Sequence, residues 1–195
     1  GENEYFTGKW AKYGHEISNS IGCADCHDSK TAELTLTRDY AKRAFREIGI
    51  DSDKASPHEL GTMVCAQCHS EYYFKATEWT DSKGNKKTAN VVTFPWQNGV
   101  GAEEMEAYYD ALNFKDWTHQ ISKAPMLKAQ HPGYEIFTTG IHFKNGVTCA
   151  NCHMPNGTHN VGSPFENMED TCLQCHTTDA AVLKEVVKTK LERKE

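Results

Sequence analysis

The sequence lacks several features that would place it in common classes of protein. It has no apolar run of the roughly 18 residues that a membrane-spanning helix needs. It has no excess of basic residues, because 27 acidic residues outweigh 21 basic ones and give a net charge of −6. That balance argues against nucleic acid as a partner and favours a partner with a basic face. Hydrophobic residues make up only 38% of the chain, below the ~45–50% that is typical of globular domains.

The sequence also has no cysteine outside one repeated motif. All 8 cysteines belong to four copies of C-x-x-C-H. The copies are Cys23/Cys26/His27, Cys65/Cys68/His69, Cys149/Cys152/His153 and Cys172/Cys175/His176. This motif is the attachment signature of a c-type haem, in which two cysteines form thioethers and the histidine binds the iron. Paired cysteines also bind zinc or form disulfides, but neither use explains a histidine after the second cysteine in every copy. We therefore predict four covalently bound haems c.

Four porphyrins would supply the apolar surface that the side chains lack. We expect a core organised around cofactors, and a polypeptide that is mostly unfolded without them. The length of 195 residues allows one or two domains, and the unequal spacing of the motifs argues against a tandem repeat. We predict a single multihaem domain over residues 1–195. The start, Gly1-Glu2-Asn3-Glu4, is not a signal peptide. Since haem c is attached outside the cytoplasm, we expect a mature or trimmed chain that is periplasmic or extracellular.

The pattern of apolar residues predicts a mostly α fold with long loops and one small surface hairpin. A helix should begin after Thr37 as its cap and end before Gly49. Its apolar face is expected to contain Tyr40, Ala41, Ala44, Phe45 and Ile48. The turn-like residues 83–85 predict a hairpin, which is the only strand-like part of the chain. A helix after Gly101 should bury Met105, Tyr108, Tyr109 and Leu112, and a final helix should cover residues 179–195.

Six histidines remain for the second axial position of the four irons. They are His15, His58, His119, His131, His142 and His159. A low-spin electron-transfer haem usually takes a second histidine or a methionine there. His142 and His159 lie close to haem motifs in sequence, which favours them. Met63, Met126 and Met154 are alternatives, although packing is the more common use of methionine.

Two longer strips of sequence indicate a family. They are residues 65–73 (CAQCHSEYY) and residues 122–132 (SKAPMLKAQHP), and shorter matches occur at residues 22–27, 116–117, 140–142 and 152–155. On these residues the chain resembles ammonia-forming cytochrome c nitrite reductase, essentially from end to end. The resemblance implies a mostly helical fold with haems rather than a sheet as its organising core.

The resemblance also implies roles for individual residues. Tyr72 and His131 would line the nitrite pocket, with His131 as a hydrogen-bond or proton donor. A calcium ion would bind the side chains of Glu71 and Gln130 and the backbone carbonyls of Tyr72 and Lys128, which are the oxygen ligands that calcium prefers. His142 would be the distal ligand of the His176 haem, and His159 that of the His27 haem.

The sequence departs from the family in several places. Family members attach a fifth, catalytic haem through C-x-x-C-K, and this sequence contains no such motif. It starts at about the place where that segment would end. None of Arg38, Arg43, Arg46 or Arg193 matches the arginine of the family's pocket. The distal ligands of the His69 and His153 haems, and the long C-terminal helices used for dimerisation, also come from regions outside these residues. The hairpin at 75–92 is longer and the loop at 154–159 shorter than in the family pattern.

Two functions remain open on these grounds. The first is the electron-relay part and half of the substrate pocket of a nitrite reductase, which passes six electrons to nitrite. Its partners would be nitrite, a redox donor protein or membrane quinol dehydrogenase, and a second copy or other cytochrome chains. The second is a non-enzymatic tetrahaem electron carrier, with His15, His58 or His119 recruited as ligands. The retained set of Glu71, Tyr72, Lys128, Gln130 and His131 favours the first.

Overall fold

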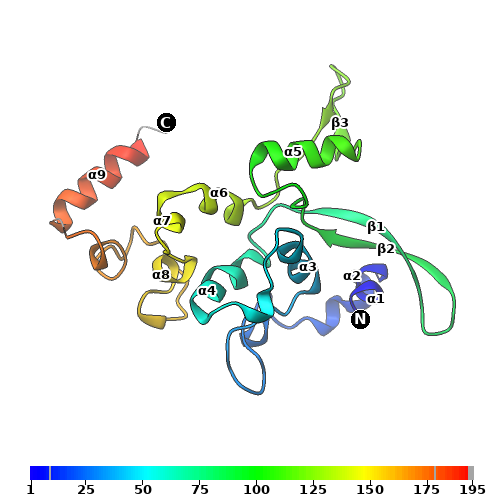
Figure 1. The fold of residues 1–195 in the computed structure, drawn as a ribbon, viewed down its shortest axis with the longest axis horizontal. Helices are drawn as coiled ribbons and strands as arrows, with labels where there is room; N and C mark the ends of the chain where they lie inside the picture. The colour runs from blue at the N-terminus through cyan, green and yellow to red at the C-terminus, as the bar shows by residue number, and fades with distance from the viewer. Residues whose placement is uncertain (9, 178, 193–195) are drawn as a thin grey trace. The chain divides into compact units, whose positions relative to one another are not determined.

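The computed structural model describes residues 1–8, 10–177 and 179–192 (Figure 1). The chain divides into two compact units, Gly1–Ile141 and His142–Glu195. The described residues are mostly helical, as predicted, and long loops join the helices. None of the described helices is long and apolar enough to cross a membrane. The prediction of a single domain stays a prediction.

The first unit contains six helices and two antiparallel strand pairs among its described residues. Its helices are α1 (Glu2–Thr7), α2 (Trp10–Tyr13), α3 (Asp39–Glu47), α4 (Pro57–Ala66), α5 (Ala102–Ala111) and α6 (Gly133–Thr139). Its 3-10 turns are η1 (Gly14–Glu16), η2 (Cys23–Asp25) and η3 (Ser52–Lys54). Its strands are β1 (Tyr73–Thr80), β2 (Lys86–Thr93), β3 (Trp117–Thr118) and β4 (Pro125–Met126). The pair β3–β4 corrects the expectation that the hairpin is the only strand-like part.

Helix α3 supplies the centre of the core of the first unit. The predicted apolar face is confirmed, because Ala41, Ala44 and Phe45 are buried against Trp96 and Tyr134. Gly49 follows the helix with φ of +81°, a left-handed conformation that glycine adopts without steric cost. The predicted cap was wrong by one residue. The N-cap position is Arg38, and the backbone N–H of Thr37 donates instead to the side chain of Gln67.

Helix α4 carries the second motif on its last turn. Ser56 and Glu59 form a reciprocal capping box at its start, and Pro57 occupies the first helical position, where a missing N–H costs nothing. Leu60, Met63 and Ala66 face the core. The burial of Met63 agrees with a packing role rather than with an axial ligand. Because the helix ends at Ala66, Cys65 lies on its last turn and Cys68 and His69 follow directly.

The predicted hairpin is confirmed, and Figure 1 shows β1 and β2 as a long ribbon. Asp81 holds its turn by accepting hydrogen bonds from the backbone N–H groups of Lys83 and Asn85, both at 2.9 Å. The hairpin is not entirely a surface element, since Ala89 and Val91 are buried. Helix α5 was predicted correctly at Tyr108 and Tyr109, which pack against Tyr73. The prediction was wrong for Leu112, which is exposed.

The second unit consists of short helices and turns at the last two motifs and a longer final helix. It contains α8 (Cys149–His153), η4 (Pro155–Gly157), η5 (Cys172–Gln174) and α9 (Ala180–Glu192), while α7 (Ile141–Lys144) begins one residue before it. Thr148 and Asn151 form a capping box at the start of α8. The final helix is confirmed as far as Glu192, and the rest of the predicted range lies outside the described residues.

Candidate functional site

Each C-x-x-C-H motif folds as a single helical turn. In three of them the backbone N–H of the histidine donates to the carbonyl of the first cysteine at 2.9 Å, at His27, His69 and His176. The third motif forms helix α8 itself. Residues at i, i+3 and i+4 of a helix share one face. The turn therefore presents both thiols and the imidazole of a motif on the same side, as attachment to one porphyrin requires.

Hydrogen bonds select the ring nitrogen that would bind iron in two of the motifs. The Nδ1 atom of His27 lies 2.7 Å from the carbonyl of Ala32, and Nδ1 of His153 lies 3.0 Å from the carbonyl of Gly162. A carbonyl only accepts hydrogen bonds, so Nδ1 carries the proton in both histidines. The Nε2 lone pair then remains available to a metal, which is the arrangement of metal-binding histidines in general.

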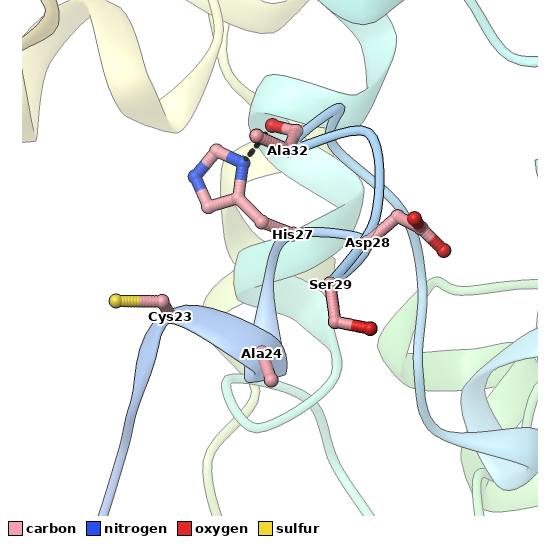
Figure 2. A pocket seen from close by; sticks show the side chains of 6 residues that line it. All are labelled: Cys23, Ala24, His27, Asp28, Ser29 and Ala32. Atoms are coloured by element: carbon pink, nitrogen blue, oxygen red, sulfur yellow. Dashed lines mark hydrogen bonds between the residues drawn. The ribbon is translucent and has the colours of Figure 1, made fainter.

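A hollow of about 450 Å³ lies beside the first motif (Figure 2). It is lined by Cys23, Ala24, His27, Asp28, Ser29 and Ala32. Figure 2 shows the sulfur of Cys23 and the ring of His27 projecting to the same side. The hollow, the thiol of Cys23 and a His27 ring that carries its proton on Nδ1 are compatible with a haem at this position.

The polypeptide leaves the cysteines of the motifs wholly or partly uncovered. Cys175, the second cysteine of the fourth motif, is exposed, and so are Cys23 and Cys68. The other five cysteines are partly buried. This exposure fits the predicted attachment, because a thioether forms at the edge of a porphyrin and the polypeptide would have to leave the sulfur of Cys175 uncovered. Its role in haem attachment stays a prediction.

The thiols of different motifs influence one another within each unit. Burial raises the pKa of the Cys26 thiol, and the neighbouring Asp25 and Cys68 raise it further. Burial likewise raises the pKa of Cys152, with added effects from other cysteines that include Cys172 and Cys175. Each unit thus brings its two motifs within electrostatic reach. In the described part of the chain, no group of three acidic, histidine or cysteine side chains is arranged to hold a metal ion.

The spacing of His142 and His176 fits two ligands on one iron. Their ring centroids are 6.2 Å apart. Two metal–nitrogen bonds of about 2 Å, with about 1 Å from each nitrogen to its ring centre, require roughly 6 Å. The prediction that His142 is the distal ligand of the His176 haem is therefore compatible with the geometry. His159 lies in the second unit, and its pairing with His27 stays a prediction.

The two strips of sequence that carried the family resemblance lie side by side in the first unit. The backbone N–H of Tyr134 donates to the carbonyl of His69 at 2.8 Å. Gly133 permits this approach, because a Cβ there would lie 3.3 Å from the same carbonyl oxygen. The carboxylate of Glu71 accepts a short hydrogen bond from the backbone N–H of Gln130. These contacts hold the segment after the second motif against the start of α6.

The predicted pocket residues Tyr72 and His131 meet at this junction. Their rings are nearly parallel, with an interplanar angle of 23° and centroids 6.4 Å apart. Tyr72 is half-buried and His131 is exposed. A phenol hydroxyl and an imidazole are both hydrogen-bond donors that can release a proton. Side by side, they place two hydrogen-bond donors at the contact between the two strips.

The predicted calcium ligand Glu71 lies in an acidic and largely buried environment. Its side chain is only 5% exposed. Burial raises the pKa of this carboxyl and nearby Asp116 raises it further, against hydrogen bonds from Gln130 and from the hydroxyl of Tyr109. Asp116 in turn accepts from the backbone N–H of Lys128 at 2.8 Å. A divalent cation bound to oxygen atoms here would offset this concentration of negative charge, which is compatible with calcium, and the set of four ligands stays a prediction.

Sequence reasoning missed Glu135, which connects the same elements. Its Oε1 accepts from the backbone N–H of Glu71 at 2.9 Å and from the indole of Trp96 at 2.7 Å. Burial raises the pKa of the Glu135 carboxyl. One hint of this role was present in the sequence, because Glu135 is the one acidic residue in an otherwise uncharged helix α6.

Comparison with known proteins agrees with this geometry. The profile of the cytochrome c552 family matches residues 1–195. The cytochrome c-552 of Desulfotalea psychrophila is 56% identical to the whole chain, and that of Maridesulfovibrio salexigens is 53% identical. The chain spans 40% of the length of both relatives.

A solved structure resembles the fold as well. It is the catalytic subunit of cytochrome c nitrite reductase from Desulfovibrio desulfuricans ATCC 27774, which has two calcium sites. The similarity has a TM-score of 0.74 at 39% identity, and covers 89% of this chain and 38% of that one. From its match along the whole length, the chain belongs to the cytochrome c552 family.

Proposed function

We propose that these residues form the electron-relay part and half of the substrate pocket of a periplasmic, ammonia-forming nitrite reductase. Four haems c would be attached at the four motifs, and a calcium ion would be held by Glu71, Gln130 and the carbonyls of Tyr72 and Lys128. The resemblance and the relatedness to a cytochrome c nitrite reductase support this proposal. Nitrite would be the substrate, and a redox donor protein would supply the electrons.

The observation that carries the proposal is the junction of the two strips. Tyr72 and His131 lie next to each other, and Glu71 links both strips through the backbone of Gln130. An electron carrier needs covalent haems but has no use for a pair of proton donors held in this way. The junction begins directly after His69, so the donors are positioned by the same turn that attaches the second haem.

The side chains of the pocket act on an anion and on its protons. Reduction of nitrite to ammonium consumes protons and creates negative charge on oxygen and nitrogen. The hydroxyl of Tyr72 and the imidazole of His131 would stabilise that charge by hydrogen bonds and supply protons. The bound haems would supply electrons when loaded. The buried carboxylate of Glu71 would fix the position of Tyr72 by binding calcium beside it.

The haem count tests the cofactor part of the proposal. Intact mass of the natively purified protein should show four haems on this part of the chain, and Cys→Ser substitution in a motif should remove one of them. Extraction of haem by acid–acetone, or metal without porphyrin, would contradict covalent attachment.

The substrate part is tested by His131→Gln in the complete protein, with His119→Gln as the matched control. His119 bonds to Ser122 in the β3–β4 turn. A steady-state assay with reduced viologen should show a loss of about 10²–10⁴-fold for the first, as expected for a lost proton donor, and little change for the second. Full nitrite turnover in His131→Gln would contradict the role of His131 as proton donor, whereas a complete wild-type protein that does not turn over nitrite would favour the alternative of a tetrahaem electron carrier.

A further inference from the structure

The side chain of Gln67 links the first two haem motifs. Gln67 lies inside the second motif and is 3% exposed. Its amide nitrogen donates to the carbonyl of Asp25 inside the first motif, at 2.9 Å, and to the carbonyl of Val64 at 3.2 Å. A bond between the middle residues of two motifs leaves little freedom in their spacing.

The same amide also holds the chain that follows the first motif. Its oxygen accepts from the backbone N–H groups of Thr37 and Arg38, at 2.8 and 2.9 Å. An amide has two donor hydrogens and two acceptor lone pairs, so every hydrogen-bonding position of Gln67 is used. The partners are two N–H groups and two carbonyls, which fixes the orientation of the amide.

Two further contacts surround this link. The hydroxyl of Tyr40 donates to the backbone carbonyl of Gln67 at 3.1 Å. The guanidinium of Arg38 forms a short ion pair with the carboxylate of Asp25. The link thus connects the first motif, the start of α3 and the second motif.

We propose that Gln67 is a positioning residue that sets the separation and tilt of the haems on the first two motifs, and so their electronic coupling. This inference rests on the proposed attachment of haem. Electron exchange between neighbouring cofactors falls steeply with the distance between them, so a change in the separation of the two haems would change the rate of exchange. A buried amide with four satisfied bonds holds such a distance more rigidly than apolar contacts, which are not directional.

The fourth motif offers a matched control. Gln174 occupies the same place in its motif as Gln67 does in the second. Gln174 is exposed, and its amide donates to the carbonyl of Glu169 at 3.1 Å, a residue just before the same motif. Substitution of Gln174 therefore removes the same side chain from the same turn without cutting a connection between two motifs.

The test compares Gln67→Leu and Gln174→Leu in the haem-loaded protein. Haem content is measured by intact mass. Spin–spin coupling between ferric haems is measured by electron paramagnetic resonance, and intraprotein electron exchange by flash reduction. We expect full haem content in both variants. Gln67→Leu should show altered spin–spin coupling and a several-fold change in the rate of electron exchange, whereas Gln174→Leu should match the wild type.

Gln67→Glu provides a second variant if Gln67→Leu fails to mature. It keeps an acceptor for Thr37 and Arg38 but sets a carboxylate oxygen against the carbonyl of Asp25. We expect altered coupling there too. Wild-type coupling and exchange in either haem-loaded Gln67 variant would overturn the proposal, as would an equal change in Gln174→Leu. A wild-type protein without covalent haem would instead overturn the proposed function.

Discussion

The two units carry the same number of haem motifs on very different supports. The first unit has a cluster of buried side chains in which Phe45 and Trp96 are fully enclosed. In the described part of the second unit, the buried side chains are Thr148, Met168 and Thr171. Its larger apolar residues, such as Phe165 and Val186, remain about half exposed. The first unit can stabilise its motifs with its own core, whereas the second depends more heavily on its cofactors.

Removal of a haem should therefore show the difference in stability between the two units most clearly. Cys172→Ser/Cys175→Ser should abolish amide protection throughout the described second unit. Cys23→Ser/Cys26→Ser should leave α3 protected, because Phe45 keeps its packing partners. Hydrogen–deuterium exchange resolved by peptide measures both. Equal loss of protection in α3 and in the second unit would refute the comparison.

Truncation in the core of the first unit should have the next largest effect. Trp96→Ala should lower the free energy of unfolding of that unit by about 3–5 kcal/mol, since the indole is fully buried and bonds to Glu135. Phe165→Ala in the second unit is the control, and should cost less because the ring is half exposed. Urea unfolding monitored by peptide-resolved hydrogen–deuterium exchange measures the free energy of unfolding of each unit. A larger loss of unfolding free energy in Phe165→Ala than in Trp96→Ala would contradict the difference proposed between the two units.

Calcium should stabilise the first unit selectively. Glu71→Gln should lower the calcium content measured by atomic emission, whereas Glu78→Gln on the exposed face of β1 should not. Calcium at about 100 times its Kd should add about 2.7 kcal/mol to the unfolding free energy of the wild-type unit, and chelation should remove it. Chelation that destabilises both units alike, or unchanged calcium content in Glu71→Gln, would contradict the assignment.

The smallest expected effect is a dependence on alkaline pH. Burial raises the pKa of Tyr40 to about 12, against about 10 in an unfolded chain. The neutral phenol is favoured in the folded state. Its contribution to the free energy of unfolding is therefore complete below about pH 10 and is lost as the pH rises towards 12. The stability difference between wild type and Tyr40→Phe should narrow over this window in the first unit. A constant stability difference between wild type and Tyr40→Phe from about pH 8 to about pH 12 would argue against a raised pKa of Tyr40.

Local patterns were predicted where neighbours along the chain decide the structure. The face of α3, the glycine after it and the turn of the hairpin all depend on residues within a few positions. Leu112 shows the limit of such patterns. Helical periodicity places it on the same side as Tyr108, but only the surrounding chain decides whether that position is covered.

The sequence by itself determined the chemistry of attachment, because C-x-x-C-H brings its three reactive groups together within one helical turn. Family resemblance added the pair Tyr72 and His131. Only the tertiary structure decided that Glu135 holds the backbone of Glu71, and that Gln67 joins two motifs. These contacts join residues 64 and 42 positions apart, and each ends on a backbone group. Backbone groups are identical at nearly every residue, so no pattern of side chains reveals which of them a buried amide or carboxylate will find.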